Sequence, residues 1–324
     1  VPDLVARAEA GEARAVGRLI SLVEDGSPAL RQVMALLAPR SGHARVVGLT
    51  GSPGVGKSTS TNALVAAYRA LGQRVGVLAV DPSSPFSGGA LLGDRVRMQD
   101  HATDDGVFIR SMASRGHLGG LSWSTPQALR VLSAAGFDVV LIETVGVGQA
   151  EVEIAGLADT TLVLLAPGMG DGIQAAKAGI LEVADIFVVN KADREGADTV
   201  VRDLRYMLSL GDRRTDDGWR VPILKTIAAR GEGAQEVVES IERHIHWMNA
   251  NGELDRRRRR RAAEEVQSIA LTALRDRIGD LRDGDTLDRL AREVVEGRTD
   301  PYSAAEDLVA AVTSSRDSER RSSS

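Results

Sequence analysis

The sequence predicts an α/β fold in which a mostly parallel sheet carries helices on both faces and helical segments flank it at both ends. Three observations support this prediction. Short apolar runs without polar alternation recur through the middle of the chain, as in strands buried on both faces. A glycine-rich loop lies directly between one such run and a helical segment. Apolar residues before residue 40 and after residue 249 recur instead with the spacing of amphipathic helices.

The first segment, residues 1–40, is an expected N-terminal helical extension. Ser27-Pro28 is typical of a helix start, and a helical apolar pattern follows it. The helix before that start has one apolar stripe, made of Ala15, Val16, Leu19, Ile20 and Val23.

Residues 41–249 are the expected sheet domain. Short apolar runs alternate there with helical or loop stretches, the arrangement of a parallel α/β sheet. The predicted strands are Val46–Leu49, Val75–Val80, Val107–Ile109, Val139–Ile142, Thr161–Leu165, Ile186–Val189 and Val221–Leu224.

Residues 250–316 are an expected C-terminal helical arm, and residues 317–324 a disordered polar tail. Three amphipathic helices are predicted, with a turn at Asp283–Asp285 and a third helix starting at Asp300-Pro301. Their apolar stripes could fold back on the sheet domain or pair with a second subunit, and we favour a homodimer. The first stripe consists of Val266, Ile269, Ala270, Ala273, Leu274, Ile278 and Leu281.

Composition narrows the classes of protein. The 324 residues are 43% hydrophobic and 26% charged, carry a net charge of −5, and include no cysteine, so disulfides and thiolate metal sites are excluded. The most apolar stretch, Thr160–Pro167, is too short to cross a bilayer. No secretory signal pattern opens the sequence, and we expect a cytoplasmic protein without a membrane partner.

The six-arginine run Arg256–Arg261 could suggest nucleic-acid binding. Acidic residues stand at helical distances on both sides of it, at Glu253, Asp255, Glu264 and Glu265. Because the chain is also acidic overall and poor in aromatic residues, we interpret the run as a solvated, salt-bridged helix face and expect no nucleic-acid partner.

A phosphate-binding loop is the strongest motif in the sequence. Residues 51–59 match G-x-x-x-x-G-K-[S/T] between a predicted strand and a predicted helix. Backbone N–H groups of such a loop surround phosphate, Lys57 would reach the β- and γ-phosphate oxygens, and the Ser58 hydroxyl would bind Mg²⁺. The predicted nucleotide-binding residues of the loop are Gly51, Ser52, Pro53, Gly54, Val55, Gly56, Lys57, Ser58 and Thr59.

A second motif selects the base. Asn190-Lys191-Ala192-Asp193 follows an apolar strand and has the N-K-x-D form of a guanine-reading segment. The Asp193 carboxylate can accept hydrogen bonds from guanine N1–H and the exocyclic amine, which adenine cannot match. The Lys191 stem would cover the base, and Asn190 would tie the segment to neighbouring loops. The sequence therefore predicts GTP and GDP as ligands.

Three carboxylates are expected around one Mg²⁺, which prefers oxygen ligands. Glu143 ends a predicted strand and begins E-x-x-G, whose Gly146 N–H would sense the γ-phosphate; Asp81 ends another strand, and Asp94 lies in a glycine-rich loop. With Lys57, we expect Asp94 and Glu143 to be the catalytic residues. We expect Ser58, Asp81, Asp94 and Glu143 to be the metal ligands.

Across residues 4–312 the chain resembles the methylmalonyl-CoA mutase-associated GTPase family. Besides the two nucleotide motifs, the resemblance rests on V-D-P-S-S-P, G-D-R-V-R-M, S-M-A-S-R-G-H-L-G-G-L-S at residues 111–122, I-E-T-V-G-V-G-Q-A-E and P-G-M-G-D-G-I-Q. It implies a P-loop NTPase G domain with an N-terminal helical extension and a C-terminal helical dimerisation arm. It also places Asp94 in switch I, Glu143–Glu153 in switch II and Gly168–Lys177 in a further mobile loop.

The resemblance further implies slow, Mg²⁺-dependent GTP hydrolysis coupled to loading, protecting and reactivating adenosylcobalamin-dependent methylmalonyl-CoA mutase. The mutase is the implied partner, and its adenosyltransferase is a further candidate. Val147, not glutamine, follows Gly146, so the water-positioning glutamine of commoner GTPases is missing at that place.

Three other classes of protein match the sequence less well. A metallochaperone GTPase needs a soft or imidazole metal site, but the five histidines are scattered, and His244 and His246 should face apart on one helix. An ATP-dependent transport-system kinase would prefer ATP and contact a membrane. The guanine motif argues against a preference for ATP. A signal-recognition-type targeting GTPase would want a methionine-rich segment, and the six methionines are dispersed.

Overall fold

The structure is a computed structural model that describes residues 1–81, 101, 103–113, 124–144, 150–168, 180–210, 218–282 and 285–310. The chain divides into two compact units, Val1–Arg261 and Ala262–Ser324. The division falls inside one long helix, α12 (Glu253–Arg282), so each unit is described by itself.

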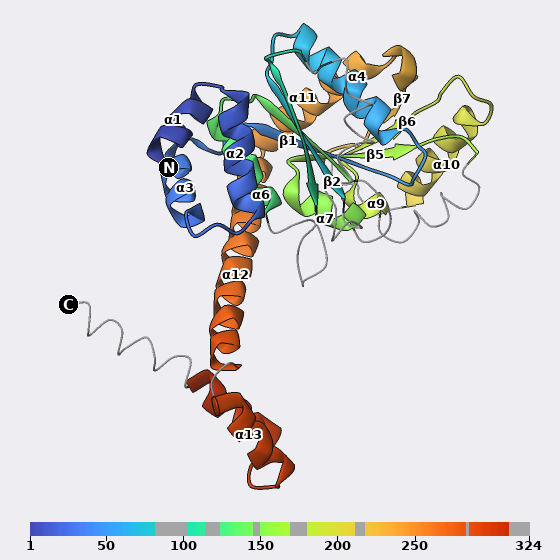
Figure 1. Cartoon of the computed structure of the whole chain (residues 1–324). Helices are drawn as coiled ribbons and strands as arrows, with labels where there is room; N and C mark the ends of the chain where they lie inside the picture. The colour runs from blue at the N-terminus through green and yellow to red at the C-terminus, as the bar shows by residue number, and fades with distance from the viewer. Residues whose placement is uncertain are drawn as a thin grey trace. The chain divides into compact units, whose positions relative to one another are not determined.

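Seven strands form one sheet in the first unit, in the order β3-β2-β4-β1-β5-β6-β7, and all neighbouring pairs are parallel (Figure 1). All seven predicted strands and the predicted α/β fold are confirmed. β7 starts two residues later than predicted, after Pro222, which has no N–H to donate to a neighbouring strand. The strands are β1 (Arg45–Thr50), β2 (Val75–Asp81), β3 (Val107–Ala113), β4 (Val139–Thr144), β5 (Thr160–Leu165), β6 (Ile186–Val189) and β7 (Ile223–Lys225).

The strand order reverses direction at β1. From β1 the chain crosses to β2 on one side, whereas β5, β6 and β7 extend the sheet on the other side. Loops that leave the carboxyl ends of the strands on either side of such a point enclose a crevice, which is where open α/β sheets bind ligands. The segment after β1 therefore occupies the position expected of a ligand-binding loop.

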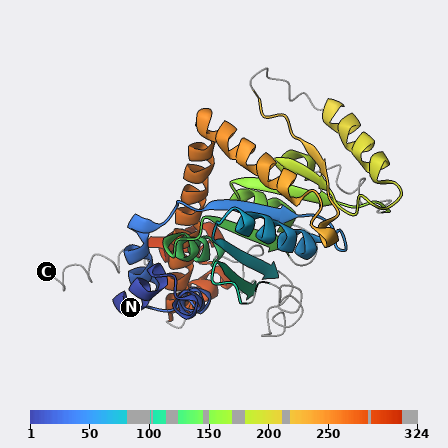
Figure 2. The same ribbon diagram turned by 90° about the horizontal axis from the view of Figure 1, so that it is seen from above.

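Helices cover both faces of the sheet (Figures 1 and 2). On one face, α4 (Lys57–Ala70) and α11 (Ala234–Ala250) pack over a cluster that contains Val47 and Leu49 of β1. Val46 of the same strand faces the opposite side and joins a second cluster. The described helices between β4 and β7 are α7 (Ala150–Leu157), α9 (Ile180–Val183) and α10 (Ala197–Leu210).

The N-terminal helices extend the second cluster. They are α1 (Pro2–Glu9), α2 (Ala13–Glu24) and α3 (Leu30–Leu37), and they lie beside α6 (Thr125–Ala134) (Figure 1). The predicted α2 stripe is confirmed, because all five of its residues are buried. Arg110 of β3 donates to the Glu24 carboxylate of α2, an ion pair that joins these helices to the sheet.

The second unit contains the remainder of α12, then α13 (Asp285–Val295) and a helix at residues 301–310. The predicted helix start at Asp300 is confirmed: Asp300 Oδ1 accepts from the N–H groups of Tyr302 and Ser303 at 2.8 and 3.1 Å. Val266, Ile269 and Leu274 on α12 are 68%, 48% and 44% exposed. None of the described helices is long and apolar enough to cross a membrane.

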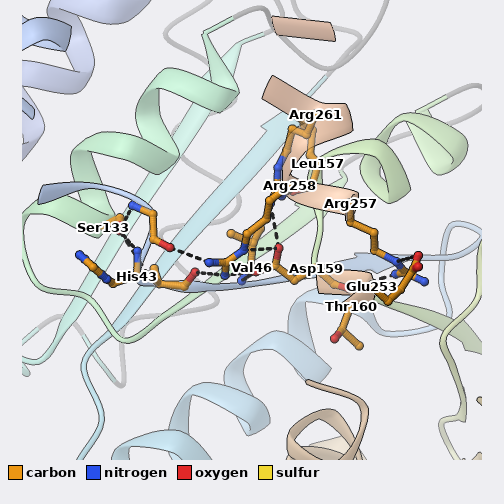
Figure 3. Close-up of polar contacts among 12 residues, drawn as sticks. His43, Val46, Ser133, Leu157, Asp159, Thr160, Glu253, Arg257, Arg258 and Arg261 are labelled. Atoms are coloured by element: carbon orange, nitrogen blue, oxygen red, sulfur yellow. Dashed lines mark hydrogen bonds and ion pairs between the residues drawn. The ribbon is translucent and has the colours of Figure 1, made fainter. Parts of the chain in front are cut away.

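The start of α12 differs from the solvated helix face that the sequence suggested. Arg258 and Arg261 both bind the carboxylate of Asp159, which is fully buried just before β5 (Figure 3). Arg258 Nη2 and Arg261 Nη2 lie 2.9 and 2.8 Å from the two carboxylate oxygens, and Val46 N–H donates to one of them at 3.0 Å. Arg258 and Arg261 are therefore partly buried against this carboxylate instead of lying on a solvated helix face.

Arg257 makes a matching contact one strand away. Its guanidinium donates two hydrogen bonds, of 2.9 and 3.0 Å, to the carboxylate of Asp185 just before β6. Arg256 and Arg259 pair with Glu253 and Asp255 on α12 itself, as the sequence suggested. The arginine run thus combines a solvated face with an ionic anchor that holds the first turns of α12 against the amino edge of the sheet.

We predict that Asp159→Asn destabilises the first unit by about 3 kcal/mol or more, because it leaves two guanidinium groups beside a buried site without their counter-charge. Urea unfolding at neutral pH measures the loss. The control is Asp198→Asn, which removes a carboxylate that is 85% exposed beside Lys225 and should cost less than about 1 kcal/mol.

The same variant should alter the response to acid. Burial opposes ionisation of Asp159, but hydrogen bonding to Arg258 and the charges of Arg261 and Arg258 outweigh it and lower the pKa of the carboxyl. The resulting stabilisation is present above the ordinary aspartate pKa of about 3.9 and is lost as the pH falls through the lowered value. An Asp159→Asn protein with unchanged stability at every pH would contradict the ionic anchor.

Candidate functional site

The phosphate-binding loop lies between β1 and α4, at the point where the strand order reverses. Lys57 is the first residue of α4, and its Nζ donates to the carbonyl oxygens of Gly51 and Ser52 at 2.6 and 3.3 Å. The lysine thus folds back over the loop. The first N–H groups of α4 also point toward the loop, and a helix N-terminus of this kind attracts anions.

Two glycines are required by the geometry of this loop. Gly51 has φ +142°, and a Cβ there would lie 2.3 Å from the Leu164 carbonyl oxygen of β5. Gly56 has φ +95°, and a Cβ there would lie 2.5 Å from Asn190 Nδ2. A larger residue at either position would clash as well as strain the backbone. The loop is therefore shaped by its close approach to β5 and to Asn190, which follows β6.

Asn190 joins the phosphate-binding loop to the predicted base-reading segment. It follows β6 directly, is 3% exposed, and donates from Nδ2 to the Val55 carbonyl oxygen at 2.9 Å. Its Oδ1 accepts from Thr226 Oγ1 at 3.2 Å and from Ala228 N–H at 3.0 Å. One buried amide thus ties together the loops that follow β1, β6 and β7.

Lys191 strengthens the same junction. It adopts a left-handed backbone conformation, with φ +57°, and its Nζ donates to the Gly54 carbonyl oxygen at 2.6 Å. The Lys191 side chain consequently bridges the two loops. Asp193 lies on the surface, where its Oδ2 is 3.8 Å from Arg230 Nη2.

Sequence reasoning missed the third loop of this junction, Thr226–Ala228. Besides the two contacts with Asn190, the Thr226 carbonyl oxygen accepts from Ala192 N–H at 3.0 Å. The available signal was the position of these residues directly after the last apolar run of the sheet, since loops after parallel strands share one edge. Arg230, which approaches Asp193, was missed as well.

Glu143 lies beside the phosphate-binding loop. It is 1% exposed near the end of β4, in register with Leu49 of β1. Its Oε1 accepts from Ser58 Oγ at 3.1 Å, and its Oε2 accepts from Thr61 Oγ1. A serine hydroxyl next to a carboxylate is a hard oxygen pair, which fits Mg²⁺ and not a soft metal.

The other predicted metal ligands fall partly outside the described residues. The backbone of Asp81 ends β2, next to β4, whereas the Asp81 side chain, Asp94 and Gly146 are outside the part of the chain that the structure describes. Within that part, no group of three or more metal-binding side chains is assembled. His244 is buried and His246 exposed on α11, so they do face apart as predicted.

The fold and the junction of loops together define a P-loop GTPase. The family model described as "Methylmalonyl Co-A mutase-associated GTPase MeaB" matches residues 16–282. The chain belongs to this family, and the predicted resemblance is confirmed.

Two relatives and one solved structure agree with this assignment. A Pyrococcus abyssi protein described as a GTPase is 45% identical over 308 residues, covering 94% of this chain and 95% of its own. GTPase ArgK of Escherichia coli is 37% identical over 269 residues, covering 81% of each chain. The crystal structure of an LAO/AO transport system kinase superposes with a TM-score of 0.70 at 27% identity, over 96% of this chain and 97% of its own.

We predict that Asn190→Ala weakens GDP binding by about tenfold or more, because two hydrogen bonds to a buried amide oxygen and one from its nitrogen are lost together. Titration with a fluorescent GDP analogue measures the effect. Asn62→Ala on α4 is the control, since its Oδ1 is buried without a hydrogen-bond partner. Equal affinities for the two variants would remove the junction from nucleotide binding.

Proposed function

We propose that this chain is a Mg²⁺-dependent GTPase that serves adenosylcobalamin-dependent methylmalonyl-CoA mutase by loading, protecting and reactivating it. The observation that supports the GTP-binding part best is the Asn190 junction, which joins the phosphate-binding loop to the guanine motif. The mutase part rests on membership of the mutase-associated GTPase family. The mutase's adenosyltransferase is a further candidate partner within the same proposal.

The residues at the phosphate-binding site have separate roles in this proposal. Residues 51–59 would surround the phosphates with backbone N–H groups, and Lys57 would leave its carbonyl acceptors for the β- and γ-phosphate oxygens. Ser58 and Glu143 would hold Mg²⁺ together with Asp81 and Asp94. The metal, when bound, neutralises negative charge that develops on the phosphates. The Gly146 N–H would report the presence of the γ-phosphate.

Base selection would depend on Asp193. The described geometry supports this role, because Lys191 lies across to Gly54 and leaves Asp193 at the surface of the same junction. Arg230 Nη2 lies 3.8 Å from Asp193 Oδ2, so a cation borders the proposed base-reading carboxylate. An adenine would leave the carboxylate facing a ring nitrogen instead of a donor pair.

The proposal includes a homodimer formed through the C-terminal helices. The exposed Val266, Ile269 and Leu274 of α12 support it, since apolar side chains on one helical stripe favour an interface. The proposed organisation is an N-terminal extension at residues 1–40, a GTPase domain at 41–249, a dimerisation arm at 250–316 and a tail at 317–324.

We predict that Asp193→Asn weakens GTP binding by about 100-fold and gains binding of XTP, whose O2 replaces the exocyclic amine of guanine. Competition of both nucleotides against a fluorescent GDP analogue measures the shift. Glu195→Gln, an exposed carboxylate-to-amide change two residues away, is the matched control and should leave selectivity unchanged. Full GTP affinity in Asp193→Asn would refute the proposed base contact.

We predict that a cognate methylmalonyl-CoA mutase raises the GTPase rate by up to about 100-fold, since a misplaced catalytic group costs about that factor and a partner can order it. The reason is local: Val147 stands where commoner GTPases have a water-positioning glutamine. Steady-state phosphate release with and without mutase measures the change, and Lys57→Ala gives the background. No acceleration at saturating mutase, with binding confirmed independently, would refute the chaperone proposal.

A further inference from the structure

Thr61 lies one helical turn after Ser58 on α4 and faces the same carboxylate. Its side chain is completely buried, and its hydroxyl donates to Glu143 Oε2 while Ser58 Oγ donates to Oε1. Residues three apart in a helix lie on one face, so the two hydroxyls hold the two oxygens of Glu143 side by side. Both oxygens of the Glu143 carboxylate therefore accept hydrogen bonds from hydroxyl groups of one helix, α4.

The Thr61 hydroxyl has a second acceptor within reach, the Lys57 carbonyl oxygen at 3.1 Å. A hydroxyl has one proton to donate, so it can serve one of these acceptors fully at a time. The ionised carboxylate is the stronger acceptor, because hydrogen bonds to charged groups are shorter and stronger than neutral ones. Thr61 therefore donates to Glu143 in preference to the Lys57 carbonyl oxygen.

The length of the Glu143 side chain explains why the hydrogen bond from Thr61 matters. A glutamate has one more rotatable bond than the aspartate found at this place in many GTPases, so its carboxylate is less closely positioned by the strand alone. A hydrogen bond on Oε2 removes that extra freedom and leaves Oε1 beside Ser58. Of the four proposed Mg²⁺ ligands, Ser58 and Glu143 are the two whose side chains the structure describes.

We propose that Thr61 is a positioning residue for the magnesium site: it fixes Glu143 so that Oε1 and the Ser58 hydroxyl face the metal together. The inference rests on the proposed Mg²⁺-dependent GTPase function and deepens it. Outer hydrogen-bond partners of metal ligands commonly contribute about 10- to 100-fold to metal affinity. The isosteric change Thr61→Val removes the hydroxyl and keeps the shape of the side chain.

The test is the Mg²⁺ dependence of GDP release, which needs no turnover. A fluorescent GDP analogue is loaded on the full chain, and its dissociation rate is measured from EDTA through a Mg²⁺ titration. In Thr61→Val the Mg²⁺ concentration that half-suppresses release should rise by about tenfold or more. The release rate in EDTA should stay close to that of the unmodified protein. An unchanged Mg²⁺ midpoint, or an equal acceleration with and without Mg²⁺, would overturn the proposal.

Two further variants separate positioning from packing. Thr61→Ser keeps the hydroxyl and loses a buried methyl group, so its melting temperature should fall while its Mg²⁺ midpoint stays unchanged. Ser60→Ala removes the neighbouring buried hydroxyl, which has no hydrogen-bond partner, and should also leave the midpoint unchanged. If Thr61→Val fails to fold, Thr61→Ala must show the same midpoint shift. A midpoint shift in Thr61→Ser equal to that of the valine variant would contradict the role of the hydroxyl.

The outcome also distinguishes this inference from the function on which it rests. If GDP release from the unmodified protein shows no response to Mg²⁺, both the positioning role and the Mg²⁺-dependent function fail. If the unmodified protein responds normally and Thr61→Val responds identically, the positioning role alone is refuted.

Discussion

The buried amide of Asn190 is the interaction on which the candidate site depends. Three loops leave the carboxyl ends of β1, β6 and β7, and each carries backbone groups that need partners once they are out of water. The buried side chain of Asn190 donates from Nδ2 to Val55 and accepts through Oδ1 from both Thr226 and Ala228. These contacts hold the three loops to one another, and loops that are held in place lose less conformational freedom when a ligand binds.

Buried carboxylates organise both edges of the same sheet. At the carboxyl edge Glu143 is held by two hydroxyls of α4, and at the amino edge Asp159 and Asp185 are held by arginines of α12. Strand β6 runs from the residue after Asp185 to the residue before Asn190, so a single strand connects the root of α12 with the guanine motif. A buried charge without its partner is expensive, which makes the ion pairs of Asp159 and Asp185 specific anchors for α12.

Much of the fold could be predicted from the sequence. Continuous apolar runs marked all seven strands, and the buried stripe of α2 followed from helical spacing. The phosphate-binding loop and Asn190–Asp193 could be found because each has a local pattern tied to a strand end. Glu143 could be singled out for the same reason, and its roles as metal ligand and catalytic residue stay predictions. Asp94 and Gly146 lie outside the described residues and stay predictions.

The remaining features depend on contacts between distant parts of the chain. Arg258 and Asp159 are 99 residues apart, so the local pattern of acidic neighbours around the arginine run favoured a solvated face. Thr61 has the appearance of an ordinary helix residue until β4 brings Glu143 beside it, 82 residues later in the chain. The part that Thr226 and Ala228 play likewise becomes visible only in their hydrogen bonds to Asn190. Polar residues with such partners carry no periodic signal of their own.

The central claim is that this junction of loops forms a guanine-nucleotide site, and equilibrium binding of GDP and ADP to the unmodified chain tests it most directly. Isothermal titration calorimetry with Mg²⁺ present should show GDP binding at least about 100-fold more tightly than ADP, because Asp193 has no donor pair to accept from on adenine. Equal affinities for the two nucleotides, or no binding of GDP, would contradict the account.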